Sequence, residues 1–209
     1  MCRGKQMKKI LGICAGLLVL GACASVPVQS CGENLARPYF FEQGETLAAF
    51  RLTVVRGEQG LDGILQIKKI GDETYEVTLY AVAGGYRIFQ ATLTREKTEY
   101  TFLTPAADHG AVRIKAERFL NLLLFPAQSQ GKCKVKSDRV RVRYKHAPMV
   151  YTYDVAETYP AQLTGPKSFG KVKLYFEDYE PYEDGQLPHT LHYKDGKVQI
   201  DLTLLRLKK

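Results

Sequence analysis

The sequence predicts an α+β protein that is mostly β: a curled antiparallel sheet, or unclosed β-barrel, with one main helix covering its concave face. Two observations lead to this class. Segments in which apolar and polar residues alternate recur along the chain, separated by glycine-rich turns at hairpin spacing, whereas only one segment has helical periodicity. The composition agrees, because the 209 residues include 13 Tyr, 9 Phe and 18 Gly but no Trp. With 45% hydrophobic residues, the chain is too apolar to be disordered.

Five alternating segments come first. In one of them, Phe50 and Leu52 alternate with Arg51 and Thr53, as on a half-buried strand. The turns between these segments are too short for crossover helices, so we expect an antiparallel meander. The expected strands are Leu47–Val55, Leu61–Ile67, Tyr75–Ala81, Tyr86–Thr94 and Glu99–Leu103.

The helix is expected within residues 105–125. Its apolar positions fall at helical spacing and Pro126 ends the run; they are Val112, Ala116, Phe119, Leu120 and Leu123. Residues 119–125 are apolar nearly all round. Two interpretations stay open for them: a deeply buried helix end, or a lid over an apolar pocket.

Alternation resumes after Gly131, and the turn at 194–197 predicts a closing hairpin. No linker separates the two groups of strands and no repeat is evident, so residues 45–209 are expected to form one domain. The second group of strands is expected at Val135–Tyr144, Val150–Val155, Val172–Tyr179, Leu191–Tyr193 and Val198–Leu207.

The N-terminus has the pattern of an export signal. A basic stretch, residues 1–9, precedes an apolar run, residues 10–20, that is short for a membrane span. The run ends in Leu20, Gly21, Ala22 and Cys23, which resembles the lipobox of bacterial lipoproteins. The resemblance implies a signal peptide at 1–22, cleavage before Cys23 and acylation of its thiol. The alternatives are an ordinary secretory signal and an uncleaved anchor.

The same resemblance implies a location. Ala24, not Asp, follows the cysteine, which in enterobacterial lipoproteins favours the outer membrane. We therefore expect a lipid-anchored protein of the bacterial outer membrane, facing the periplasm, with membrane lipid as a partner through Cys23. Residues 23–44 are expected to be the lipidated N-terminus and a flexible tether.

Export also explains the charge and the cysteines. The formal net charge is +8, but four of the 30 basic residues lie in the predicted signal and none of the 22 acidic ones do, so the mature chain carries +4. Nucleic acid is therefore not an expected partner. Cys31 and Cys133 are the cysteines left over, and they suit either a disulfide in an oxidising periplasm or two free thiols. The four histidines lack zinc spacings, so we expect neither a metal nor a cofactor.

Several stretches together resemble the lipoprotein-localisation fold, LolA/LolB-like, and most closely its uncharacterised lipoprotein relatives. They are the lipobox, Phe50–Val54, Gly85–Leu93, Ala116–Pro126 and the closing hairpin from Leu187. The resemblance covers about residues 45–207. It implies an unclosed barrel whose concave face accepts acyl chains of lipids or lipoproteins, possible roles being lipid or lipoprotein trafficking to the outer membrane. The candidate lining residues are Leu65, Ile67, Val77, Leu79, Phe89, Leu93, Val140, Val142, Val172, Leu174, Phe176, Ile200 and Leu202, with Phe119 and Leu123 from the helix.

Two charged stretches are further candidates. Arg139, Arg141 and Arg143 alternate with valines, which places them on one strand face as candidates for anionic lipid headgroups; a solvated or edge-protecting face is the alternative. The stretch 175–185 holds five carboxylates among aromatic residues and is a candidate contact for an envelope protein.

An enzyme is not expected. The chain has no nucleophile elbow, no zinc-protease motif and no phosphate-binding glycine loop, and no catalytic residue is proposed. The alternative to lipid binding is a structural envelope lipoprotein that binds a protein partner through a sheet edge or the acidic loop, without lipid cargo.

Overall fold

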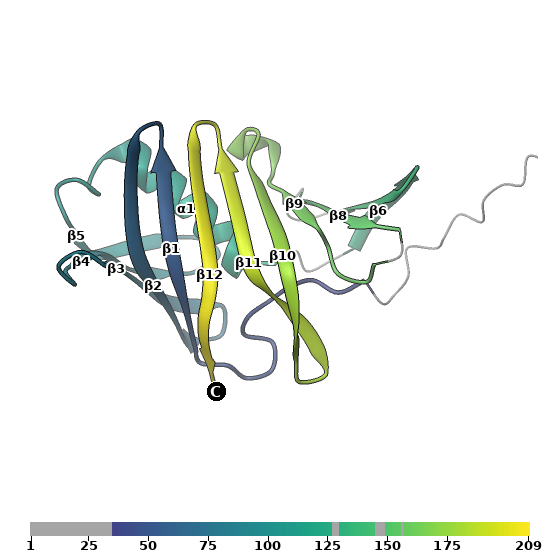
Figure 1. Cartoon of the computed structure of the whole chain (residues 1–209), viewed down its shortest axis with the longest axis horizontal. Helices are drawn as coiled ribbons and strands as arrows, with labels where there is room; N and C mark the ends of the chain where they lie inside the picture. Colours follow the sequence, from purple (N-terminus) through teal and green to yellow (C-terminus); the bar gives the residue numbers. More distant parts are fainter. Residues whose placement is uncertain (1–34, 127–129, 145–148, 156) are drawn as a thin grey trace, which may run out of the picture. The chain divides into compact units, whose positions relative to one another are not determined.

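The computed structural model describes residues 35–126, 130–144, 149–155 and 157–209 (Figure 1). Within them the chain forms one antiparallel sheet, the α-helix α1 (Gly110–Leu124) and the short 3-10 helix η1 (Lys167–Phe169). The predicted signal, Cys23 and Cys31 lie outside the described residues, so the signal, the lipidation and the disulfide stay predictions. No described helix has the length and apolar character needed to cross a membrane.

The sheet has twelve strands in the order β5-β4-β3-β2-β1-β12-β11-β10-β9-β8-β7-β6. The first and last strands therefore pair in the middle, β5 and β6 form the two edges, and α1 lies in the connection between those edges. This confirms the predicted fold class, an unclosed curled sheet with one main helix. The strands are β1 (Leu47–Arg56), β2 (Gln59–Gly71), β3 (Thr74–Ala81), β4 (Arg87–Leu93), β5 (Thr98–Leu103), β6 (Gln130–Lys136), β7 (Arg139–Tyr144), β8 (Val150–Asp154), β9 (Gln162–Thr164), β10 (Lys173–Tyr182), β11 (Gly185–Asp195) and β12 (Val198–Lys208).

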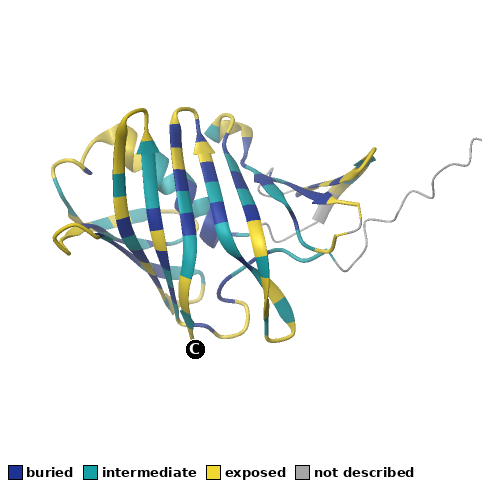
Figure 2. Ribbon diagram, in the orientation of Figure 1, coloured by how far each residue is buried: buried dark blue, intermediate teal, exposed yellow. Residues whose placement is uncertain are grey.

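Period-two alternation decides which side chains face the core. Along β7 the exposed Arg139, Arg141 and Arg143 alternate with the buried Val140 and Val142. Figure 2 shows buried and exposed bands along the central strands β1 and β12. The apolar face packs inward and the polar face meets solvent, as the sequence predicts for half-buried strands.

The expected strand Val135–Tyr144 is wrong, because it is a hairpin. Ser137 and Asp138 form the turn between β6 and β7, and Ser137 has a left-handed φ of 54°. Val135 pairs directly with Val140 across this hairpin, so both face the core although they are five residues apart. That odd spacing breaks the alternation of a single strand and was the signal for the turn.

The last hairpin is longer than expected. The sequence predicts a strand only at Leu191–Tyr193, but β11 runs from Gly185 to Asp195 and pairs with β10 out to Tyr182. Pro188 obscured this strand, since proline is rare inside strands. The short strand β9 was not expected at all.

The folded unit begins before the expected boundary at residue 45. Phe40 and Phe41 are each only 2% exposed and belong to the core. The Ala36 amide donates a hydrogen bond to the Thr158 carbonyl, and the Thr46 amide donates one to the Lys208 carbonyl. Residues 35–46, which we call the strap, are thus part of the domain, and the expectation of a flexible tether over 23–44 is wrong for 35–44.

Only part of α1 enters the core. Its buried residues are Phe119, Leu120, Leu122, Leu123 and Leu124. At the other end Val112 is 41% exposed and Ile114 is 50% exposed, so Val112 does not belong to the buried face that its spacing predicts. The first turn has no acidic residue, and no side chain caps it, so neither capping nor the helix dipole stabilises this end of the helix.

Candidate functional site

The predicted lining residues come together on the inner face of the sheet. All fifteen of them are buried in one hydrophobic core. They come from six strands and from α1, except for Val172, which lies directly before β10. The curled sheet thus gathers aliphatic and aromatic side chains into one apolar surface, and α1 packs on that surface through its C-terminal half.

The helix end fills the space against the sheet. The Phe119 ring packs edge-on against Tyr193, with 5.2 Å between centroids, and the Phe125 ring packs against Tyr75 at 5.5 Å. Gly165 lies against the same helix end, since a Cβ atom there would be in van der Waals contact, at 3.5 Å, with the Leu122 methyl groups. The apolar surface is therefore covered by the leucine-rich helix end.

One carboxylate ties α1 to the sheet. Asp195, at the end of β11, is 8% exposed. Its Oδ1 lies 3.1 Å from the Lys115 Nζ, and its Oδ2 lies 3.5 Å from an Arg118 guanidinium nitrogen. Lys115 also donates a hydrogen bond to the Asp195 carbonyl at 3.0 Å. These two basic residues on adjacent turns hold the helix over the β11–β12 hairpin.

The strap covers another part of the inner face. Phe40 packs edge-on against Phe50 at 5.1 Å, and Phe41 packs against Tyr75 at 5.3 Å. The Tyr39 hydroxyl is hydrogen-bonded to the Tyr75 hydroxyl. These residues were not among the predicted ones, although the aromatic run at 39–41, directly before the first strand, is a usable signal for core packing.

A pocket of about 400 Å³ lies beside the strap. Charged residues line most of it, and Arg95 and Glu73 form an ion pair of 2.6 Å there. Burial raises the pKa of Tyr75 well above its usual range, so its hydroxyl stays protonated at neutral pH and is a poor nucleophile or base. The pocket is lined by Arg37, Tyr39, Phe41, Glu42, Lys69, Asp72, Glu73, Tyr75, Arg95, Leu124 and Pro126.

The predicted headgroup residues lie on the opposite face of the sheet. Arg141 and Arg143 line an open groove of about 640 Å³ on the outer, polar face. Arg139 lies outside this groove and is 3.9 Å from Asp154. The structure therefore does not bring the arginines and the apolar lining residues together, because successive side chains of β7 point to opposite faces.

The acidic stretch 175–185 forms the end of the β10–β11 hairpin. Three of its five carboxylates have partners within the chain: Glu177 lies 3.4 Å from His192, Glu180 lies 3.6 Å from His189, and Glu183 lies 2.5 Å from Lys209. Among the described residues no group of three His, Cys, Asp or Glu side chains is placed to hold a metal ion. Protein binding through this hairpin stays a prediction.

Comparison with solved structures identifies the architecture. A LolA superfamily protein from Nitrosomonas europaea superposes with a TM-score of 0.55 at 10% identity, over 84% of this chain and 90% of that chain. The fold is LolA-like. At this identity the LolA-like likeness describes the fold alone.

Two further structures are similar at lower scores. One is a domain named as an outer membrane lipoprotein-sorting protein, from Vibrio parahaemolyticus, with a TM-score of 0.42, 10% identity and coverage of 79% of this chain and 85% of that chain. The other is a DUF1329 family protein from Desulfovibrio piger, with a TM-score of 0.43, 8% identity and coverage of 78% and 85%. No protein-family model and no curated protein matches the sequence, so the LolA-like assignment depends on the fold.

Proposed function

We propose that this chain is a lipid-anchored envelope protein that binds an acyl chain of a lipid or lipoprotein on the inner face of its sheet. The observation that carries the proposal is the apolar inner face of an unclosed LolA-like sheet, covered by a single helix of which only the C-terminal half is buried. The anchor is acylated Cys23, and the location is the periplasmic side of the outer membrane.

In this mechanism the acyl chain replaces the leucine-rich end of α1. A 16-carbon chain gains roughly 12 kcal/mol on leaving water, at about 0.8 kcal/mol per CH₂. The five buried helix residues gain about 1.5–3 kcal/mol each, or roughly 7–15 kcal/mol together. Because these gains are similar, α1 and an acyl chain can exchange on the same surface at little net cost.

The ion pairs at Asp195 would set the balance of this exchange. They stabilise the state in which α1 covers the inner face, and they are lost when α1 moves away with Lys115 and Arg118. Trafficking follows if a partner protein or membrane shifts the balance between bound helix and bound ligand, so that an acyl chain is accepted at one place and released at another.

Native mass spectrometry tests the proposal. Residues 24–209, which lack the predicted signal and the acylated cysteine, would be expressed in a bacterial host and purified without detergent. We expect a fraction of the protein to carry added mass, and denaturing extraction should release it as fatty acid or phospholipid. A protein that shows only the bare polypeptide mass, and that also fails to bind a fluorescent fatty acid, would refute acyl-chain binding.

A further inference from the structure

The outer-face groove collects five basic side chains from three strands. We call it the basic groove. We propose that the basic groove binds the phosphate group of an anionic phospholipid headgroup. Its cations come from the edge strand β6, from its neighbour β7 and from β10, with uncharged residues of β8 and β9 between them. The lining residues are Lys132, Lys134, Arg141, Arg143, Val150, Thr152, Gln162, Thr164 and Lys173.

Strand register explains why these residues meet. One row across the sheet runs from Lys134 through Arg141 and Thr152 to Gln162, because each is the direct partner of the next. The second row runs through Arg143, Val150, Thr164 and Lys173. Two cations directly opposite each other, as Lys134 and Arg141 are, destabilise a sheet unless an anion lies between them.

The groove lacks an internal counter-charge. No acidic residue lines it, and among the described residues no carboxylate lies within ion-pair distance of any of its five cations. Arg139, on the same face of the same strand, does have a carboxylate partner, Asp154. Arg139 is therefore an internal reference for what an arginine outside the groove does.

The lining groups suit phosphate. Two guanidinium groups can each donate a pair of hydrogen bonds to phosphate oxygens, and the lysines add point charges. Thr152 is only 6% exposed, so its side chain forms part of the groove floor, and the Gln162 amide donates a hydrogen bond to the Thr164 hydroxyl at 2.9 Å. The volume of about 640 Å³ exceeds one phosphate and is in the range of small-molecule sites.

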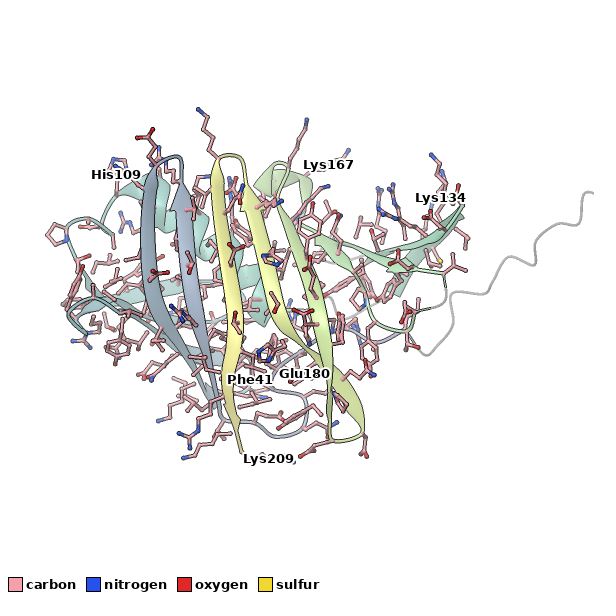
Figure 3. All side chains as sticks on the ribbon, viewed as in Figure 1. Phe41, His109, Lys134, Lys167, Glu180 and Lys209 are labelled. Carbon is pink, nitrogen blue, oxygen red and sulfur yellow. The ribbon has the colours of Figure 1, made fainter. Side chains whose placement is uncertain are left out.

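The headgroup in this groove belongs to a different molecule from the proposed cargo. The groove and the acyl-binding surface are on opposite faces of the same sheet, so binding in the groove does not depend on acyl-chain binding; only the choice of a lipid source rests on the anchor of the proposed function. Figure 3 shows Lys134 projecting from the sheet edge near β6, where a membrane surface can approach without meeting α1 or the strap. A lipid source is favoured because the predicted anchor would hold the chain next to a membrane, where each basic residue adds to binding.

Titration calorimetry of the full chain in non-ionic detergent tests this inference. The probes are dihexanoyl phosphatidylglycerol, dihexanoyl phosphatidylcholine and glycerol phosphate. We expect the phosphatidylglycerol to bind most tightly and to weaken as salt is raised. The double variant Arg141→Gln, Arg143→Gln should weaken it about thirtyfold, which is the effect of losing two headgroup-facing charges.

The matched control is Arg139→Gln, which removes the same charge from the same strand face outside the groove and should change the affinity less than twofold. Equal binding of both phospholipids, or an equal loss in the control variant, would overturn the inference. Binding of glycerol phosphate as tightly as the phosphatidylglycerol would assign the groove to a soluble phosphate and overturn the lipid. Fluorescent fatty-acid binding should be the same in both variants, which separates this test from that of the proposed function.

Discussion

Asp195→Asn should destabilise the domain and at the same time strengthen acyl-chain binding. The substitution removes the carboxylate that lies 3.1 Å from Lys115 and 3.5 Å from Arg118, and it keeps the size of the side chain. Both cations belong to α1 and the carboxylate belongs to the sheet. The loss therefore acts on the contact that has to open if α1 moves aside for a ligand.

The size of the effect follows from burial. The Asp195 side chain is 12% exposed, whereas those of Lys115 and Arg118 are 32% and 29% exposed and can reach water once the carboxylate is gone. The cost thus lies between that of exposed pairs and that of fully buried ones, at about 1–2 kcal/mol. For a chain of this length that lowers the Tm by about 2–8 °C. The same free energy no longer opposes displacement of α1, so the affinity should rise about 5- to 30-fold.

Thermal unfolding followed by circular dichroism and titration with a fluorescent fatty acid measure the two effects on residues 24–209. Asp201→Asn is the matched control, since Asp201 pairs with His192 at 2.6 Å on the outer face and should leave the affinity unchanged. A merely damaged domain would lose both stability and affinity. If Asp195→Asn lowers the Tm without tightening the binding, α1 is not what the ligand displaces.

Three further predictions concern the core and the strap. Phe119→Trp introduces a fluorophore into a chain without tryptophan, and phospholipids with brominated acyl chains should quench its fluorescence. The control Phe102→Trp, at a position that is 37% exposed and lies under Arg87, should be quenched far less. Equal quenching of the two variants would contradict binding at the inner face. Phe41→Ala should lower the free energy of unfolding by about 3–5 kcal/mol in urea denaturation, whereas a change below about 1 kcal/mol would show that the strap is dispensable. At alkaline pH, absorbance at 295 nm should reveal a class of tyrosines that ionise only as the domain unfolds, because burial raises their pKa. The stability that these tyrosines contribute below the pKa of the unfolded state is lost as the pH rises through their pKa in the folded state. Ionisation of all 13 Tyr in a single step near pH 10, with the fold intact, would contradict this. That class includes Tyr75, Tyr100, Tyr153, Tyr179 and Tyr193.

The sequence predicted the fold where a single period governed the chain. Alternation marks the first five strands, because most of them are half-buried, and glycine marks the turns that join β1 to β2, β2 to β3 and β3 to β4. The same rule failed where a turn interrupted it: Val135 and Val140 face the same side only because Ser137 and Asp138 reverse the chain between them. Periodicity measures which residues share a face and not where the chain turns.

The residues of the candidate site were predictable only as far as alternation reaches. All of the predicted inward side chains are buried, because alternation along a strand decides which side chains face the core. Which elements cover that face depends on contacts between distant segments, such as Phe41 on Tyr75, which no local pattern contains. The arginines of β7 were recognised as a set, but only strand register shows that Lys173, thirty residues further on, joins Arg143 across β8 and β9 and that Arg139 does not belong to the groove.

The pairing of β1 with β12 has a consequence for how the sheet forms. Every other strand pair described in the sheet joins neighbours along the chain, so most hairpins can form from local contacts. The centre of the sheet instead needs partners more than 140 residues apart, such as Thr53 and Asp201, and contacts of such long range form slowly. Synthesis of β12, the eleven residues Val198–Lys208, must finish before the two halves can join. Until then β1 has an unpaired edge, which another chain could pair with.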